Sequence, residues 1–299
     1  MERGKKPKVL VVCGPTAVGK SDIAVQLAKR FKGEVVSADS RQVYKGLDIG
    51  TGKICTREMR GVRHWLLDVA NPKRKFSVTQ YVTLAKRAIA NILSRGKLPI
   101  VCGGTGFYIQ ALVEGIVLPD VQPNAKLRAK LAKKSARELL KMLRKLDPRR
   151  AKEIDKNNKR RVIRAIEIAK ALGKVPRVIA EAPYRALYIG ITLPKEELHK
   201  RITVRLFARM KAGMVREVKR LHRQGISWKR MEELGLEYRY LARYLQGKLT
   251  RAETIRQLNT EIWHYAKRQM TWFKRNKKVH CFSISRIRSV KKEVGGFLE

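Results

Sequence analysis

Acidic residues, paired cysteines and long hydrophobic runs are all scarce in this sequence of 299 residues. Only 25 residues are Asp or Glu against 69 Lys or Arg, so the formal net charge is +44. A compact fold with this imbalance repels itself, and a polyanionic partner would offset the repulsion; a Lys and Arg bias of the whole proteome is the alternative. Hydrophobic residues make up 44% of the chain, which argues against a natively disordered protein.

Cysteine and histidine usage points away from disulfides and metal clusters. The four cysteines form no CxxC pair, and three of them lie in apolar, strand-like runs, so buried free thiols in a reducing cytoplasm explain them best. The five histidines make no metal-ligand spacing with one another or with cysteine. No apolar run approaches the roughly 18–20 residues of a transmembrane helix, and the N-terminal one is shorter than a signal-peptide core. We therefore expect a cytoplasmic protein without membrane association.

Short apolar runs alternate with helical patterns along much of the chain. The runs that predict strands are 8–13, 34–38, 98–102, 186–193 and a final short one at 279–283. The pattern over 77–94 predicts a helix with Ser77 as its N-cap. Strands separated by helices are typical of a parallel α/β sheet with flanking helices.

Residues 120–181 break this alternation, because they contain no strand-like run and their leucines recur at helical spacings. We expect an all-helical subdomain inserted into an α/β core that comprises residues 1–119 and 182–299, including C-terminal helices. Residues 126–164 hold 17 Lys or Arg among 39, and 267–292 hold ten with no acidic residue. A charge run is usually a solvated helix face, but two such segments on so basic a chain favour an RNA-binding surface.

A glycine-rich phosphate loop follows the first predicted strand and opens a helical pattern. Residues 14–21 read GPTAVGKS and match G-x-x-x-x-G-K-[ST]. Backbone amides of such a loop converge on phosphate oxygens, the lysine adds positive charge, and the serine hydroxyl holds a divalent cation. The loop therefore predicts a diphosphate or triphosphate with Mg²⁺. Its residues are Gly14, Pro15, Thr16, Ala17, Val18, Gly19, Lys20 and Ser21, with Ser21 as the metal ligand.

A carboxylate, Asp39, ends the second predicted strand, in the region where parallel α/β proteins bind ligands. This side chain could act as a general base or as a water-mediated metal ligand. Taken alone, an Asp that caps a turn is the simpler interpretation. The third predicted strand ends in Cys102-Gly103-Gly104, without the carboxylate that an ATPase would carry there.

Together these motifs resemble the tRNA dimethylallyltransferases. The matching blocks follow the family's order over almost the whole chain: GPTAVGKS at 14–21, SADSRQVYKGLDIGTGK at 37–53, GGTGFY at 103–108, NNKRRVIRAIE at 157–167, LHKRITVRLFARMKAG at 198–213 and YAKRQMTWFKR at 265–275. The resemblance implies a P-loop NTPase-like α/β fold. It also implies transfer of a dimethylallyl group from dimethylallyl diphosphate to the exocyclic N6 amine of adenine 37 in the anticodon loop of tRNA, with release of diphosphate. No zinc finger of the eukaryotic kind follows the core, which favours a bacterial-type enzyme.

By motif position, the resemblance also implies roles for single residues. The phosphate loop would cradle the diphosphate of dimethylallyl diphosphate rather than ATP, and Asp39 would accept a proton from the adenine amine. Thr16 would lie between the amine and the leaving oxygen, and Arg205 would steady the diphosphate. The residues expected to contact tRNA are Asp39, Ser40, Arg41, Gln42, Thr105, Arg128, Arg160, Arg161, Val162, Ile163, Arg164, Leu234, Gly235, Leu236, Glu237, Tyr238 and Arg239. Glu237 departs from the family pattern, which usually has glycine there.

The chemistry that the resemblance implies is physically reasonable. An aromatic exocyclic amine is a poor nucleophile, so its alkylation needs a base, a good leaving group and donors that meet the growing charge. Three alternatives remain open. A relative that prenylates free AMP, ADP or ATP would not need the basic helical insertion; a P-loop kinase of small molecules would leave the later blocks unexplained; a non-catalytic RNA-binding protein would not need a phosphate loop beside Asp39. We expect a monomer.

Overall fold

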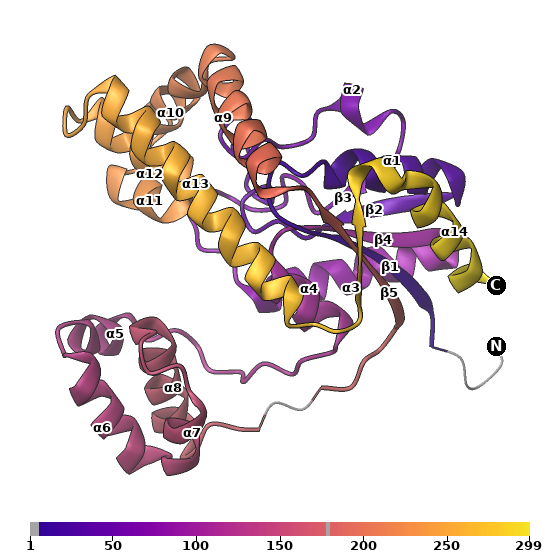
Figure 1. The fold of residues 1–299 in the computed structure, drawn as a ribbon. Coiled ribbons are helices and arrows are strands. Elements are labelled where there is room, and N and C mark those ends of the chain that lie inside the picture. Colours follow the sequence, from indigo (N-terminus) through magenta and orange to yellow (C-terminus); the bar gives the residue numbers. More distant parts are fainter. Residues whose placement is uncertain (1–5, 178–179) are drawn as a thin grey trace. The chain divides into compact units, whose positions relative to one another are not determined.

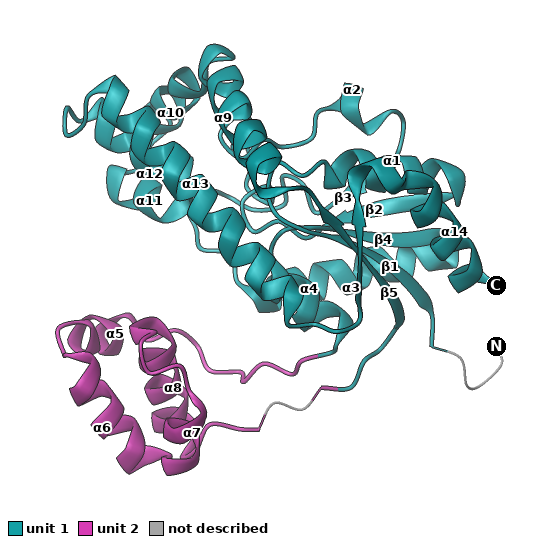
Figure 2. Ribbon diagram, viewed as in Figure 1, with its two compact units in different colours: residues 1–115, 181–299 teal, residues 116–180 magenta. Residues whose placement is uncertain are grey.

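The structure, a computed structural model, describes residues 6–177 and 180–299. The chain divides into two units, residues 1–115 with 181–299 (unit 1) and residues 116–180 (unit 2), which Figure 2 shows in different colours. The division expected from the sequence, at 119/120 and 181/182, lies within a few residues of these boundaries.

Unit 1 is built around a six-stranded sheet in which all neighbouring strands are parallel (Figure 1). Across the sheet the strands are β3 (His64–Trp65), β2 (Gly33–Ser37), β4 (Leu98–Gly103), β1 (Lys8–Cys13), β5 (Arg185–Thr192) and β6 (Val279–Ser283). The five predicted strands lie within one residue of the observed bounds, and the parallel α/β fold is confirmed. Strand β3 was not predicted from the sequence, because two residues are too few to give a periodic signal.

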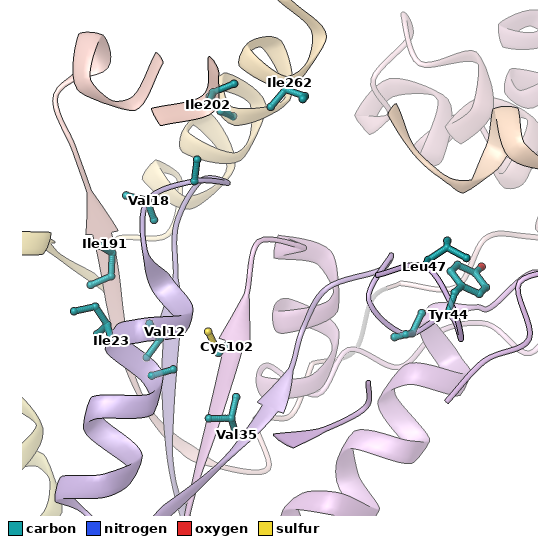
Figure 3. Packing of buried hydrophobic residues seen from close by; sticks show 14 of the residues in the cluster. Val12, Val18, Ile23, Val35, Tyr44, Leu47, Cys102, Ile191, Ile202 and Ile262 are labelled. Carbon is teal, nitrogen blue, oxygen red and sulfur yellow. The ribbon is translucent and has the colours of Figure 1, made fainter. Parts of the chain in front are cut away.

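Side chains of the central strands are buried on both faces of the sheet. Along β1, Val9 and Val11 join one apolar core while Leu10 and Val12 join the other, as the two-residue period of a strand requires. Figure 3 shows part of the second core, in which Val12 lies with Ile23 of the first helix. This double burial explains why the strand reads as a continuous apolar run.

Helices cover this sheet and extend from it. They are α1 (Lys20–Arg30), α2 (Thr56–Met59), α3 (Val78–Ser94), α4 (Gly106–Val113), α9 (Lys195–Lys211), α10 (Met214–Arg223), α11 (Trp228–Leu234), α12 (Leu236–Leu245), α13 (Arg251–Lys274), the 3₁₀ turn η1 (Ile284–Arg286) and α14 (Ile287–Leu298). The predicted helix at 77–94 is confirmed, with Ser77 and Gln80 forming a capping box at its start. None of the helices in the described part of the chain is both long and apolar enough to cross a membrane.

The described residues of unit 2, 116–177 and 180, form four helices with an apolar core of their own. They are α5 (Ala125–Ala132), α6 (Ala136–Leu146), α7 (Pro148–Glu153) and α8 (Lys159–Leu172). Leu131, Leu139, Leu143 and Ile166 are among the residues that fill this core. Each helix begins after a side-chain cap, as at Ser135 of α6, so the breaks between the helices are encoded locally.

Two of the free cysteines are buried and two are exposed. Cys13 and Cys102 are buried, as expected for thiols in strand-like runs, whereas Cys55 and Cys281 are exposed. The expectation of burial was wrong for Cys281, because β6 is an edge strand.

Candidate active site

A cavity of about 770 Å³ opens in unit 1 at the carboxyl ends of β1, β2 and β4. Its walls come from the loops after these three strands and from α9, α12 and α13. This edge of a parallel sheet is where α/β proteins bind ligands. Thr16, Asp39 and Arg205, the three residues with an expected catalytic role, all line this one cavity.

The phosphate loop occupies the turn between β1 and α1. Gly14 has φ +144°, and a Cβ there would lie 2.5 Å from the carbonyl oxygen of Ile191 in β5, so glycine alone fits. Gly19 is in the left-handed conformation immediately before α1, and Ala17 also has a positive φ. This backbone path presents the first amides of α1 to the cavity, in the arrangement that binds anions.

Lys20 supplies positive charge within the loop. Its Nζ donates to the carbonyl oxygen of Pro15 at 2.5 Å. Burial lowers the pKa of the Lys20 ammonium, while the carboxylate of Asp39 acts in the opposite direction. An anion bound in the loop would favour the charged form further.

Gln269 of α13 ties the phosphate loop to the end of β4. Its Oε1 accepts the backbone N–H of Thr16 at 2.8 Å, and its Nε2 donates to the carbonyl oxygen of Gly104 at 2.9 Å. The side chain is buried, so both of its hydrogen-bonding groups are used within the protein. No role for Gln269 was predicted from the sequence, although the residue lies in the block 265–275 that carries the family resemblance.

Asp39 lies just beyond β2, and its two carboxyl oxygens differ in their surroundings. Oδ1 accepts the backbone N–H groups of Arg41 at 2.8 Å and Gln42 at 3.3 Å. The described part of the chain contributes no hydrogen bond to Oδ2. The turn-capping interpretation is confirmed for Oδ1, and the functional role of Asp39 stays a prediction for which Oδ2 is the available oxygen.

Arg205 projects from α9 toward the segment after β2. A Cβ at Gly52 would lie 3.0 Å from Nη2 of Arg205, so this guanidinium closely approaches the backbone of the cavity wall. Desolvation, together with the charge of Arg209, lowers the pKa of Arg205. An arginine with an ordinary pKa above about 12 still keeps its charge at neutral pH, so the cavity retains a cation here.

The oxygen donors beside the phosphate loop suit Mg²⁺. Ser21 lies exposed in the first turn of α1 and lines the cavity with Asp22 and Asp39. In the described residues, no group of three or more His, Cys, Asp or Glu could hold a metal by itself. Mg²⁺ in phosphate sites takes one or two protein oxygens and completes its shell with phosphate and water, so this sparse set fits it.

Most of the expected tRNA contacts of unit 1 line the same cavity. The lining residues are Asp39, Ser40, Arg41, Gln42, Gly235, Leu236, Glu237 and Arg239. Thr105 supports them, since its Oγ1 accepts the backbone N–H of Ser40 at 3.0 Å. Leu234 and Tyr238 are buried in the core and do not line the cavity, so the structure does not place them to contact a ligand as expected.

Glu217 of α10 is a second buried residue that the sequence analysis missed. Its carboxylate accepts the backbone N–H groups of Asp48, Ile49 and Gly50 at 2.7–3.0 Å and the hydroxyl of Tyr238 at 2.8 Å. Glu217 thereby fixes the segment that leads to the cavity-lining residues 51 and 52.

The expected tRNA contacts of unit 2 surround one buried carboxylate. Arg128 of α5 makes two hydrogen bonds to Glu167, at 2.9 and 2.6 Å, and Arg164 of α8 pairs with the same carboxylate. Burial raises the pKa of Glu167, but the hydrogen bonds from the two arginines outweigh it and lower the pKa to about 2. The side chains of Arg128 and Arg164 are 40% and 34% exposed, which leaves them within reach of phosphates.

The remaining residues of this group divide between surface and core. Arg160 and Arg161 are exposed at the start of α8. Val162 is buried in the core of unit 2, and Ile163 is half-buried. The two exposed arginines are therefore the ones whose charge no carboxylate in the described chain offsets.

The sheet, the phosphate loop and the acid after β2 define a P-loop α/β protein in which the loop and a carboxylate line one cavity. The family model described as IPP transferase matches residues 42–276. The chain belongs to this family.

Relatives of known sequence and structure agree with this assignment. A protein of Anoxybacillus flavithermus named tRNA dimethylallyltransferase is 43% identical over 93% of this chain and 91% of its own. A tRNA isopentenylpyrophosphate transferase structure from Bacillus halodurans is 37% identical, with a TM-score of 0.75 over 98% of this chain and 96% of its own. A eukaryotic dimethylallyltransferase described as acting on tRNA is 26% identical, with a TM-score of 0.78 over 93% of this chain and 74% of its own.

Proposed function

We propose that this protein is a tRNA dimethylallyltransferase. It transfers the dimethylallyl group of dimethylallyl diphosphate to N6 of adenine 37 in the anticodon loop and releases diphosphate. The observation that carries the proposal is the convergence of the phosphate loop, Asp39 and Arg205 on one cavity. The kinship with proteins named for this activity favours tRNA over free nucleotides as the acceptor.

The phosphate loop and Arg205 prepare the leaving group. The allylic carbon–oxygen bond of dimethylallyl diphosphate breaks as negative charge grows on the diphosphate. Loop amides, the Lys20 ammonium and the Arg205 guanidinium would surround that position, so they stabilise the negative charge as it develops. The allylic carbon accepts positive character in the transition state, which lowers the demand on the weak amine nucleophile.

Asp39 acts on the nucleophile. As the N6–carbon bond forms, one N6 proton passes to Oδ2 of Asp39, the oxygen without a hydrogen bond from the described chain. Oδ1 stays bonded to the backbone amides of Arg41 and Gln42, which holds the carboxylate in one orientation. Thr16 lies at the mouth of the phosphate loop and would orient the amine toward the leaving oxygen.

Ser21 is the residue that would hold Mg²⁺ beside the loop, and the cation would neutralise part of the diphosphate charge. The chain's own contribution there is the loop backbone, which Gln269 fixes through the amide of Thr16.

Affinity for tRNA would come mainly from phosphate contacts made by the basic surface of unit 2. Such contacts position an RNA without reading its sequence. The target adenine must leave the loop stack to enter the cavity. We further propose that the protein works as a monomer in the cytoplasm, where tRNA is available.

Mapping the modified base tests this proposal. An unmodified anticodon stem-loop with adenine 37 is incubated with dimethylallyl diphosphate and Mg²⁺, then digested and analysed by mass spectrometry. We expect the added group at nucleotide 37, and no product when guanine replaces that adenine. Modification at another adenine would contradict the proposed target.

A further inference from the structure

Two arginines of α9 face the cavity together. Arg205 and Arg209 are four residues apart, so they lie on one face of the helix, one turn from each other. Both guanidinium groups lie within 4 Å of the position that a Cβ on Gly52 would take. Both side chains line the cavity of about 770 Å³ that holds Asp39.

Glu237 is the carboxylate partner of Arg209. Its Oε1 accepts a hydrogen bond from Nη1 of Arg209 at 3.2 Å, and the same Nη1 donates to the carbonyl oxygen of Gly50 at 3.1 Å. The side chains of Arg209 and Glu237 are only 14% and 18% exposed. This pair is therefore fixed in the cavity wall rather than free at the surface.

The positive charge of the two arginines is incompletely matched by the protein. In the part of the chain that the structure describes, the guanidinium of Arg205 has no hydrogen-bond or ion-pair partner, and Nε and Nη2 of Arg209 have no acceptor; Nε is buried. Buried donors without acceptors are rare in native proteins and call for an explanation. An anion between the two guanidinium groups would supply the missing acceptors.

We infer that Arg209 is a second arginine ligand of the diphosphate, and that Glu237 is a positioning residue that holds Arg209 beside Arg205. This inference rests on the proposed function and adds to it a binding residue that the resemblance does not assign. A guanidinium suits this task because its planar donors bind phosphate oxygens in pairs. Glu237 uses the position of the family's usual glycine to fix the added cation.

The two arginines favour a diphosphate over the adenine base as the ligand that lies between them. A diphosphate carries several negative charges, whereas the adenine base is neutral and its N6 amine donates rather than accepts. A donor-rich wall of two guanidinium groups thus matches the leaving group and not the amine. Electrostatic repulsion between the two arginines is offset when such a polyanion lies between them.

Inorganic pyrophosphate is the direct probe. Its affinity for the full-length protein with Mg²⁺ is measured by calorimetry, and the KM values for dimethylallyl diphosphate and for tRNA are measured in parallel. Arg209→Met keeps a long side chain but removes the charge. We expect roughly tenfold weaker pyrophosphate binding and a similar rise in KM for dimethylallyl diphosphate, with an unchanged KM for tRNA. Lys211→Met, at an exposed position of the same helix, is the matched control and should change none of these values.

Variants of Glu237 test its positioning role. Glu237→Gln still accepts a hydrogen bond from Arg209 and should keep pyrophosphate affinity within about threefold of the wild type. Glu237→Ala frees the guanidinium and should lose most of the affinity that Arg209→Met loses. The double variant should bind as weakly as Arg209→Met alone, because the two residues act through one interaction. Thermal unfolding of each variant shows whether the fold is intact.

Wild-type pyrophosphate affinity in a folded Arg209→Met variant would overturn the inference. So would a loss confined to the KM for tRNA, which would make Arg209 an RNA contact. A wild-type protein that binds pyrophosphate through Arg209 but transfers no prenyl group to tRNA would overturn the proposed function and leave this inference standing.

Discussion

The two carboxyl oxygens of Asp39 have different surroundings. Its Oδ1 accepts hydrogen bonds from the backbone of the following turn, and its Oδ2 is the oxygen that we propose takes up the substrate proton. Glu237 has only a structural contact of this kind, since its carboxylate accepts a hydrogen bond from Arg209 and, as proposed, meets no ligand itself. At the scale of the residue, function thus depends on which atom of a side chain the protein leaves unbonded.

Asp39→Asn separates these two duties. Asn keeps an oxygen that accepts the amides of Arg41 and Gln42, but its other terminal atom is an amide nitrogen that takes up no proton. We expect kcat to fall about 10²–10⁴-fold with little change in either KM, as for the loss of a general base. Steady-state kinetics with tRNA check this. A large loss of kcat in Asp39→Ala and only a mild one in Asp39→Asn would assign the carboxylate a turn-capping role alone.

At the scale of elements, two helices that come late in the chain, after β5, hold the loops at the carboxyl ends of the strands. Helix α13 reaches the phosphate loop through Gln269, and α10 holds the segment after β2 through Glu217. The loops that carry the chemistry are thus held by side chains 160 or more residues away. Mutations in these helices should act on catalysis without touching a ligand.

Gln269→Ala is expected to impair substrate binding and folding stability together. The substitution leaves the Thr16 amide and the Gly104 carbonyl without partners in a buried place, which costs about 1–3 kcal/mol for each group. The phosphate loop loses its tie to β4, so KM for dimethylallyl diphosphate should rise. Urea unfolding and kinetics measure the two effects. A destabilised variant with normal KM would show that the loop keeps its shape unaided.

The ion pair between Arg128 of α5 and Glu167 of α8 predicts that the free energy of unfolding depends on pH. Glu167 has its pKa lowered from the usual 4.5 to about 2 in the folded protein, so its contribution to stability is present above pH 4.5 and is lost as the pH falls toward 2. We expect the difference in unfolding free energy between the wild type and Glu167→Gln to shrink over this interval. Urea unfolding at several pH values measures it. A constant difference would contradict the ionised pairing with Arg128 and Arg164.

The elements also show what a sequence can and cannot predict here. The strand bounds and the phosphate loop follow from local patterns, because an apolar run and a glycine-rich turn specify their own conformation. The roles of Gln269, Glu217 and Arg209 could not be predicted, since each depends on a partner far away in the chain. The departure at Glu237 is visible in the sequence, but its partner emerges only when α9 and α12 are placed together.

At the scale of the whole molecule, charge is the dominant property. A large share of the formal net charge of +44 lies in residues 126–164, most of unit 2. Only Glu138, Asp147, Glu153 and Asp155 oppose the 17 basic residues of that stretch. A long-range attraction for polyanions such as RNA follows from this charge.

Salt dependence of tRNA binding tests the contribution of unit 2. Arg160→Ala combined with Arg161→Ala should weaken tRNA binding and make the slope of log K against log salt shallower by about one for each phosphate that is no longer bound. Lys86→Ala with Arg87→Ala, on exposed positions of α3, removes the same charge and is the control. Equal effects in both double variants would mean that net charge alone, not this surface, binds the RNA.

Prenyl transfer with two acceptors in parallel tests directly whether the protein is a tRNA dimethylallyltransferase. Labelled dimethylallyl diphosphate and Mg²⁺ are given to the wild-type protein with unmodified tRNA or with AMP, and the label in each acceptor is counted. We expect label in tRNA and none in AMP. Label in AMP alone would make the protein a nucleotide prenyltransferase, and label in neither acceptor with a folded protein would contradict the assigned activity.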